Sequence, residues 1–293
     1  MKANIKSVKK EDIHKVRYFT SVITIEHGKV IKISNPAISH CPLAGFLYKG
    51  LKRSESFPIS RLKSELKKVI EEKITQFGFC TKDRVFWDDG VSVPYGASEI
   101  IAHGLINKAI DSSVIVCDGA GTVAVSIPQV VQGIGARMHS ILRTSAIPGV
   151  IERLHQYGCR TINNGGVIDQ KRGVIEAAKE GYKNIAVTVN AYQGESLKNI
   201  RALEKQYGIS LIILAICTTG VSGERINEIG KYADLVWACR SKEVRNILCI
   251  KAVEILSDAS PVYILTQKGK MFVSGYSPNI FRMRKKMERS IVS

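Results

Sequence analysis

The chain lacks several features that would assign it to a class of protein at once. Its 293 residues contain no uninterrupted apolar run as long as the roughly 18 residues of a membrane-spanning helix. No apolar segment typical of a signal peptide follows the basic residues at its start. A hydrophobic fraction of 45% with 24% charged residues is typical of a folded globular protein and argues against disorder. We therefore expect a soluble cytoplasmic protein with no membrane partner.

The cysteines include no C-x-x-C pair, which excludes the compact spacings of zinc knuckles and ferredoxins. There are seven cysteines, an odd number, and no export signal accompanies them. A disulfide framework is therefore not expected, and reduced thiols or metal ligands are favoured. The seven are Cys41, Cys80, Cys117, Cys159, Cys217, Cys239 and Cys249.

Acidic residues are scarce relative to basic ones, and the formal net charge is +17. Such a charge attracts nucleic acid, acidic proteins and anionic metabolites alike. The densest basic block is residues 282–289, and it lacks the interleaved aromatic residues of a single-strand-binding surface. We therefore do not expect nucleic acid as a partner. The block is interpreted as a solvated tail, with a docking segment for a protein partner as the alternative.

The periodicity of apolar residues predicts an α/β fold. Residues 1–92 are expected to form an N-terminal region with a β-hairpin around His27-Gly28 and an amphipathic helix over 59–77. Residues 93–293 are expected to form an α/β domain with the basic C-terminal tail. In that domain short β-branched runs alternate with helical segments, which favours a mostly parallel sheet flanked by helices, with Rossmann-like layering.

Within residues 93–293 the pattern predicts these bounds. The helices are expected over 97–110, 128–137, 148–156, 170–180, 197–206, 222–232 and 244–256. The strands are expected over 113–117, 160–162, 184–189, 211–217, 234–239 and 262–265.

Three of these strands end in a cysteine that is followed by small or polar residues, at Cys117, Cys217 and Cys239. If the strands are parallel, the three thiols lie at one carboxyl edge of the sheet. Open α/β folds bind their ligands at that edge. The carboxyl edge is therefore where we expect a site.

The motif at the end of the first of these strands is Cys117-Asp118-Gly119-Ala120-Gly121-Thr122. The backbone N–H groups of Gly119 and Gly121 and the Thr122 hydroxyl are suited to binding an anion. The motif lacks the third glycine of a dinucleotide fingerprint, and no Gly-Lys-Ser/Thr of a P-loop follows. A ligand-binding loop and a tight turn with a buried cysteine are the two interpretations.

Two further segments carry candidate ligand contacts. Gly133 and Gly135 interrupt a helical pattern at a cost of roughly 1 kcal/mol each, and Arg137 follows them. Close helix packing explains this pattern, and so does a helix end that faces a ligand, with Arg137 gripping its carboxylate or phosphate. Thr218 and Thr219 supply hydroxyls that either cap a helix or bind phosphate.

Cys41 and Cys80 lie in polar, loop-like segments outside the apolar periodicity. Together with Cys117 they would supply three thiolate ligands to a metal ion or an iron–sulfur cluster. The alternative is that all three are free buried thiols. The cofactor question stays open on this basis.

Five motifs occur in order along the chain: His40-Cys41-Pro42, Phe79-Cys80-Thr81-Lys82-Asp83-Arg84, Tyr95-Gly96-Ala97-Ser98-Glu99, the Cys117–Thr122 motif preceded by Val116, and Val131-Gln132-Gly133-Ile134-Gly135-Ala136-Arg137. Together they resemble the methanogenesis marker protein 8 family of methanogenic archaea and some anaerobic bacteria, over residues 15–268. Cys217 departs from the histidine that the resemblance leads us to expect before Thr-Thr-Gly. The resemblance carries over no established reaction. It implies an anaerobic setting and an accessory or maturation role.

Three functions are compatible with these observations. The first is an accessory or maturation protein that binds an anionic ligand, or an iron–sulfur or other metal centre, at the carboxyl edge of the sheet. The second is an enzyme that acts on a small phosphorylated or carboxylated metabolite, with Cys117 and Asp118 in the reaction. The third is a scaffold that docks a protein partner through its basic C-terminus. Whether the protein is an enzyme stays open.

Overall fold

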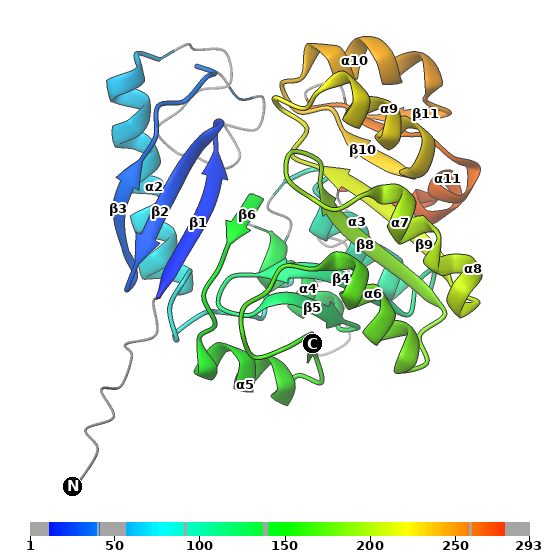
Figure 1. Ribbon diagram of the computed structural model, residues 1–293, viewed down its shortest axis with the longest axis horizontal. Helices are drawn as coiled ribbons and strands as arrows, with labels where there is room; N and C mark the ends of the chain where they lie inside the picture. Colours follow the sequence, from blue (N-terminus) through cyan, green and yellow to red (C-terminus); the bar gives the residue numbers. More distant parts are fainter. Residues whose placement is uncertain are drawn as a thin grey trace, which may run out of the picture.

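The computed structural model describes residues 12–39, 41, 57–90, 93–136, 140–257 and 260–278. In these ranges the protein is a mixed α/β structure with two sheets, and helices cover both faces of the larger one (Figure 1). The helices are α2 (Ile59–Phe77), α3 (Ala97–Ile106), α4 (Pro128–Gly135), α5 (Pro148–Gln156), α6 (Gln170–Lys179), α7 (Leu197–Arg201), α8 (Leu203–Tyr207), α9 (Gly223–Tyr232), α10 (Lys242–Leu248) and α11 (Gln267–Val273). None of them is long and apolar enough to cross a bilayer.

The smaller sheet is antiparallel, with the strand order β3-β2-β1-β6. Its strands are β1 (Ile13–Tyr18), β2 (Ser21–Glu26), β3 (Lys29–Ile33) and β6 (Ser140–Arg143). The predicted hairpin is confirmed, because His27 and Gly28 form the turn between β2 and β3. The apolar face of α2 packs on this sheet, with Leu62, Leu66 and Ile70 fully buried.

The fourth strand of this sheet comes from the middle of the chain. Residues Lys15 to Arg17 of β1 pair with Ser140 to Arg143 of β6. The division at residue 92 stays a prediction, and the sheet of the N-terminal region draws one strand from beyond it. Strand β6 is absent from the sequence-based expectation, because four residues carry too short a pattern to be recognised.

The larger sheet has the order β11-β12-β10-β9-β8-β4-β5-β7. Its strands are β4 (Ser112–Cys117), β5 (Gly121–Val125), β7 (Arg160–Thr161), β8 (Asn184–Asn190), β9 (Ser210–Ile216), β10 (Leu235–Trp237), β11 (Glu254–Leu256) and β12 (Val262–Ile264). Only the central strands β4, β8, β9 and β10 are parallel neighbours, whereas the outer strands on both sides pair antiparallel.

The prediction of a mostly parallel, Rossmann-like sheet is therefore wrong for the outer strands, because only the four central strands pair in parallel. After β4 the chain turns back on itself at once, so that Cys117 pairs with Gly121. Near the other end the predicted helix over 244–256 stops at Leu248, and Glu254–Leu256 forms an edge strand. Apolar runs look alike in parallel and antiparallel strands, so their period alone does not reveal the direction of pairing.

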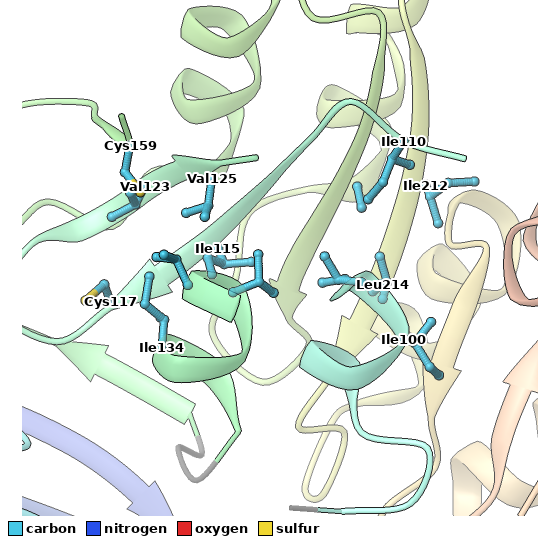
Figure 2. Packing of buried hydrophobic residues seen from close by; sticks show 14 of the residues in the cluster. Ile100, Ile110, Ile115, Cys117, Val123, Val125, Ile134, Cys159, Ile212 and Leu214 are labelled. Carbon is cyan, nitrogen blue, oxygen red and sulfur yellow. The ribbon is translucent and has the colours of Figure 1, made fainter. Parts of the chain in front are cut away.

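Helices pack on both faces of the larger sheet and divide its core into two layers. Apolar residues of α3, α4, α5 and α11 cover one face. Those of α6, α7, α8, α9 and α10 cover the other. Figure 2 shows part of the first layer, where Ile115 and Cys117 of β4 lie on the side of the sheet that α4 covers through Ile134.

Gly121 fixes the sharp turn between β4 and β5. Its φ of +79° lies in the left-handed region. A Cβ atom here would lie 2.2 Å from the Val167 carbonyl oxygen, and the next residue, Thr122, donates its N–H to that oxygen at 2.9 Å. Glycine is therefore required both by the conformation and by the close approach of the segment before α6.

We predict that Gly121→Ala lowers the free energy of unfolding by at least about 2 kcal/mol more than Gly158→Ala. Gly158 is the matched control, because its φ is +72° but no atom lies within 4 Å of its would-be Cβ. Urea denaturation of both variants measures the difference. Equal losses would show that the contact with Val167 is unimportant.

Candidate functional site

A cavity of about 310 Å³ lies at the carboxyl ends of the parallel strands. The strand ends that line it include Val116 of β4 and Asn190 of β8, followed by Cys217 after β9 and Cys239 after β10. We call it the edge cavity. It lies at the edge where the strand-end cysteines predict a site, but Cys117 is not part of its lining.

Most of the lining of the edge cavity is apolar. Among its apolar residues are Ile101, Ile115, Val131, Ile134, Ile141, Leu142, Ile168, Ile216 and Trp237. Its polar residues are Ser98, Glu99, Ser140, Gln170, Thr188, Asn190, Gln193, Glu195, Ser260 and the two cysteines. In the part of the chain that the structure describes, no lysine or arginine is among them.

The smaller sheet closes one side of the edge cavity. Strand β6 contributes Ser140, Ile141 and Leu142 to the lining. Arg17 of β1 stacks on the Tyr192 ring at 3.8 Å and donates to the Thr219 carbonyl oxygen at 2.9 Å. Burial lowers the pKa of Arg17, although the neighbouring Cys217 opposes this effect. A buried cation thus lies at the same edge as the two cysteines.

Cys217 directly follows β9, and Cys239 lies two residues after the end of the neighbouring strand β10. Both are half-buried free thiols, and both have a left-handed backbone, with φ of 62° and 46°. Burial raises the pKa of the Cys217 thiol to about 12, and Cys239 adds to this effect. Burial also raises the pKa of Cys239, although hydrogen bonds from the Thr218 and Cys217 backbone lower it in part. Both thiols are therefore protonated near neutral pH.

Glu99 is a buried carboxyl group in the wall of the edge cavity, at the first turn of α3. Its side chain is 1% exposed and accepts hydrogen bonds from the Val93 N–H at 3.1 Å and the Ser98 hydroxyl at 2.9 Å. Burial raises its pKa despite these bonds. Gly96 leaves room for it, because a Cβ there would lie 2.1 Å from the Glu99 carboxyl. The local backbone is thus shaped around this side chain.

A second carboxyl group of the lining, Glu195, forms a hydrogen-bonded pair with Asp169 at the start of α6. Glu195 accepts from the Lys171 N–H at 2.9 Å, and Asp169 accepts from the Arg172 N–H at 2.7 Å. Burial, followed by the neighbouring Asp169, raises the pKa of Glu195 to about 7. Arg225 stabilises the same loop by donating to the Glu195 carbonyl oxygen at 2.7 Å.

The comparison with known proteins places the chain in a family. A family model described as an uncharacterized protein conserved in archaea (DUF2099) matches residues 14–275. The chain belongs to this family. It is also similar to a protein named Uncharacterized protein MJ0054 from Methanocaldococcus jannaschii. The two are 37% identical over 249 residues, which cover 85% of this chain and 84% of that protein. The family match includes all the residues that line the edge cavity.

Asp118, a candidate for catalysis, lies in a buried ion pair. Its carboxylate accepts from Arg84 Nε at 2.9 Å, and both side chains are 1% exposed. The other carboxylate oxygen accepts from the Cys80 N–H at 2.6 Å. Arg84 also donates to the Gly133 and Ile134 carbonyl oxygens at 3.1 Å each, near the end of α4. The catalytic role of Asp118 stays a prediction, while its contacts join the loop around residues 80–84 to β4 and α4.

Of the three cysteines proposed as metal ligands, Cys80 and Cys117 are buried and Cys41 is half-buried. Cys117 is fully buried, and its thiol donates to the Asp118 carbonyl oxygen at 3.2 Å. Cys80 and Cys41 pack in the core under the smaller sheet. Burial raises the pKa of Cys80 and of Cys117 well above the usual range, and Asp118 adds to both effects. No group of three His, Cys, Asp or Glu side chains suited to a metal occurs within the described ranges.

The donors of the glycine-rich motif have partners inside the protein. The Gly119 N–H donates to the Thr144 hydroxyl at 2.7 Å, and the Thr122 hydroxyl donates to Gln170 Oε1 at 2.6 Å. The motif forms the β4–β5 turn, and Gly119, Gly121 and Thr122 are not part of the cavity lining. Their predicted role in ligand binding stays untested.

The remaining candidates divide between close packing and the cavity. A Cβ on Gly133 would lie 1.9 Å from the Phe86 carbonyl oxygen, and one on Gly135 would lie 2.7 Å from Ser98 Cβ. Gly135 also lines the edge cavity. Arg137 lies outside the described residues, as do His40 and the basic block 282–289.

Thr218 and Thr219 brace the loop that carries Cys217. The Thr218 hydroxyl donates to the Trp237 carbonyl oxygen at 2.7 Å, and the Thr219 hydroxyl accepts from the Arg240 N–H at 3.2 Å. These bonds connect the ends of β9 and β10. The sequence pattern singled out neither Glu99 nor Glu195 as a cavity residue. Their place in the cavity wall depends on the packing of segments that are distant in sequence.

We predict that Asp118→Asn lowers the free energy of unfolding by about 3–5 kcal/mol, because it leaves the Arg84 charge buried without a counter-charge. Asp83→Asn is the control. Its ion pair with Lys82 at 2.8 Å is exposed to solvent, so its loss costs at most about 1 kcal/mol. Urea denaturation measures both. Similar small losses would contradict a structural role for the buried pair.

The raised pKa of Glu195 predicts a dependence of stability on pH. A carboxyl group with a higher pKa in the folded protein stabilises the fold at low pH, and this contribution is lost as the pH rises through the folded value. The free energy of unfolding of the wild type should therefore fall between pH 4.5, the ordinary value, and about pH 7. Glu195→Gln should flatten this fall, whereas Glu224→Gln, on an exposed side chain, should not. Parallel profiles for the two variants would contradict the assignment.

Proposed function

We propose that the protein binds a small organic molecule in the edge cavity and acts as a cytoplasmic accessory or maturation protein of anaerobic metabolism. The observation that carries the proposal is the cavity of about 310 Å³ at the carboxyl edge of four parallel strands. Ligand sites of α/β proteins are concentrated at this edge. Cavities of this size with apolar walls and a few polar groups are typical of small-molecule sites.

The lining supports a ligand with an apolar body and a polar end. Ile101, Ile134 and Trp237 supply apolar walls. The Ser260 hydroxyl is buried and lacks a hydrogen-bond partner among the described residues, so a polar ligand group would relieve the cost of its burial. For an anionic group, Arg137 remains the predicted counter-charge, because it directly follows Ala136 of the lining.

The anaerobic role is supported by relatedness alone. The similar protein MJ0054 comes from the methanogen Methanocaldococcus jannaschii, which agrees with the resemblance to the methanogenesis marker protein 8 family. The iron–sulfur or metal alternative, with Cys41, Cys80 and Cys117 as ligands, gains no support from the described residues. We therefore favour an organic ligand.

An enzyme that acts on a small metabolite is the second candidate, and Glu99 favours it. Burial raises the pKa of the Glu99 carboxyl group, and a carboxyl group with a raised pKa is suited to general acid–base catalysis. Cys117 and Asp118, the residues first proposed for a reaction, do not line the edge cavity. A reaction in this cavity would instead involve Glu99.

We predict that Leu142→Trp abolishes binding in the edge cavity, because the indole would occupy space that Leu142 now borders. The test is thermal stabilisation of the anaerobically purified protein by a panel of neutral, carboxylated and phosphorylated metabolites. A metabolite at a hundred times its Kd should stabilise the wild type by about 2.7 kcal/mol. Leu256→Trp, at a half-buried leucine outside the lining, is the matched control and should respond like the wild type.

Stabilisation of the Leu142→Trp variant equal to that of the control would show that the metabolite binds elsewhere. If no metabolite stabilises the wild type, native mass spectrometry of the protein from its own cells gives the second reading. The proposal would be overturned if no metabolite stabilises the protein and the protein from its own cells carries no small molecule.

A further inference from the structure

We propose that Cys217 and Cys239 form a redox-active dithiol in the edge cavity that reduces small organic disulfides. The inference rests on the proposed function, in that the cavity must admit a small organic molecule. It concerns a different pair of thiols from those first proposed as metal ligands. Its basis is the placement of two free cysteines side by side in the wall of one cavity.

The fold brings the two cysteines within reach of one disulfide bond. Strands β9 and β10 are parallel neighbours, with Leu214 opposite Leu235 and Ala215 opposite Val236. Cys217 lies two residues beyond Ala215 and Cys239 three residues beyond Val236, and the Cys217 backbone N–H donates a hydrogen bond to the Cys239 sulfur. Neighbouring strands lie about 4.8 Å apart, and the Cα atoms of a disulfide usually lie about 5.5–6 Å apart. The two sulfurs can therefore be joined without a rearrangement of the sheet.

The surroundings of the two sulfurs differ, and the difference assigns their roles. Hydrogen bonds from the backbone N–H groups of Thr218 and Cys217 stabilise negative charge on the Cys239 sulfur. Ser140 does the same for Cys217, but burial still raises the pKa of that thiol to about 12. Successive N–H groups beside a left-handed residue form a concavity that suits an anion. Because the thiolate is the nucleophile, Cys239 is the attacking residue and Cys217 the resolving one.

The environment favours uncharged states of the pair. Arg17 lies near Cys217, and Arg245 donates to the Cys239 carbonyl oxygen at 2.7 Å, but burial still keeps both thiols protonated at rest. A metal dithiolate would need two buried anions and further ligands, and no third ligand side chain joins the pair within the described ranges. A dithiol and a disulfide are both neutral. Burial therefore favours thiol–disulfide chemistry over metal binding at this place.

The reaction balances without a further reagent. The Cys239 thiolate attacks one sulfur of the organic disulfide, whose S–S bond breaks, and the first thiolate leaves with the proton that Cys239 released. The Cys217 sulfur then attacks Cys239, displaces the second thiolate and passes its own proton to it. The cysteine pair is oxidised by two electrons to a disulfide, and the organic disulfide is reduced to two thiols.

The test uses the full-length reduced protein and hydroxyethyl disulfide, a small neutral probe. We expect the wild type to form a Cys217–Cys239 disulfide, identified by peptide mapping under non-reducing conditions. Cys217→Ser should stop at a mixed disulfide on Cys239, because the resolving thiol is missing. Cys239→Ser should form an adduct on Cys217 at least about tenfold more slowly, because burial raises the pKa of that thiol to about 12 and leaves little thiolate.

The exposed Cys249 supplies the matched control. Cys249→Ser should form the Cys217–Cys239 disulfide at the rate of the wild type. Mapping of the wild type alone decides the case if a serine variant does not fold. Failure of hydroxyethyl disulfide to join the two cysteines, under conditions in which it modifies Cys249, would overturn the proposal.

The two proposals fail in different ways. Metabolites that stabilise the protein through the edge cavity, together with unreacted Cys217 and Cys239, would overturn the dithiol and leave the ligand-binding function standing. A disulfide that forms in a protein that no metabolite stabilises, and that carries no small molecule from its cells, would overturn the ligand-binding function and support the dithiol.

Discussion

The buried ion pair between Arg84 and Asp118 connects more parts of this molecule than any other polar contact described above. Asp118 lies directly after a central strand, and Arg84 lies in the loop that follows α2. Through the remaining donors of its guanidinium, Arg84 also binds the carbonyl oxygens at the end of α4. The stack of Arg84 over the Phe79 ring at 4.1 Å holds the same loop. Arg84 thus joins the loop after α2 to the larger sheet and to the helix that borders the edge cavity.

This constraint explains how a mainly apolar cavity persists between two sheets. The walls formed by α3 and α4 are fixed to the larger sheet by their core residues, whereas the wall formed by β6 belongs to the smaller sheet. Arg17, on its strand β1, reaches across to the Thr219 carbonyl oxygen on the opposite side. Arg17 and Arg84 together hold the two sheets in their relative position. The cavity therefore depends on charged groups that are themselves withdrawn from solvent.

Much of the local structure could be predicted from the sequence, and the long-range pairing could not. The helices over 59–77 and 148–156 have the expected bounds, because each shows one apolar stripe with clear end signals. The return of the chain after Cys117 could not be predicted, since two glycines serve a hairpin as well as a ligand loop. Among the three strand-end cysteines, the sequence favoured Cys117, because a glycine-rich turn follows it. Only the packing of the final turns places two of them at the cavity and the third in the core.

The pairing of β1 with β6 has a consequence for how the chain assembles during synthesis. More than a hundred residues separate the two strands, so β1 leaves the ribosome long before its partner exists. Until then, the hairpin of β1 and β2 presents an unpaired strand edge, which is prone to associate with other chains. Contacts of such long sequence separation also slow folding. The nascent protein is therefore most exposed to misassembly before residue 143 emerges, when β6 becomes available to cover the exposed edge of β1.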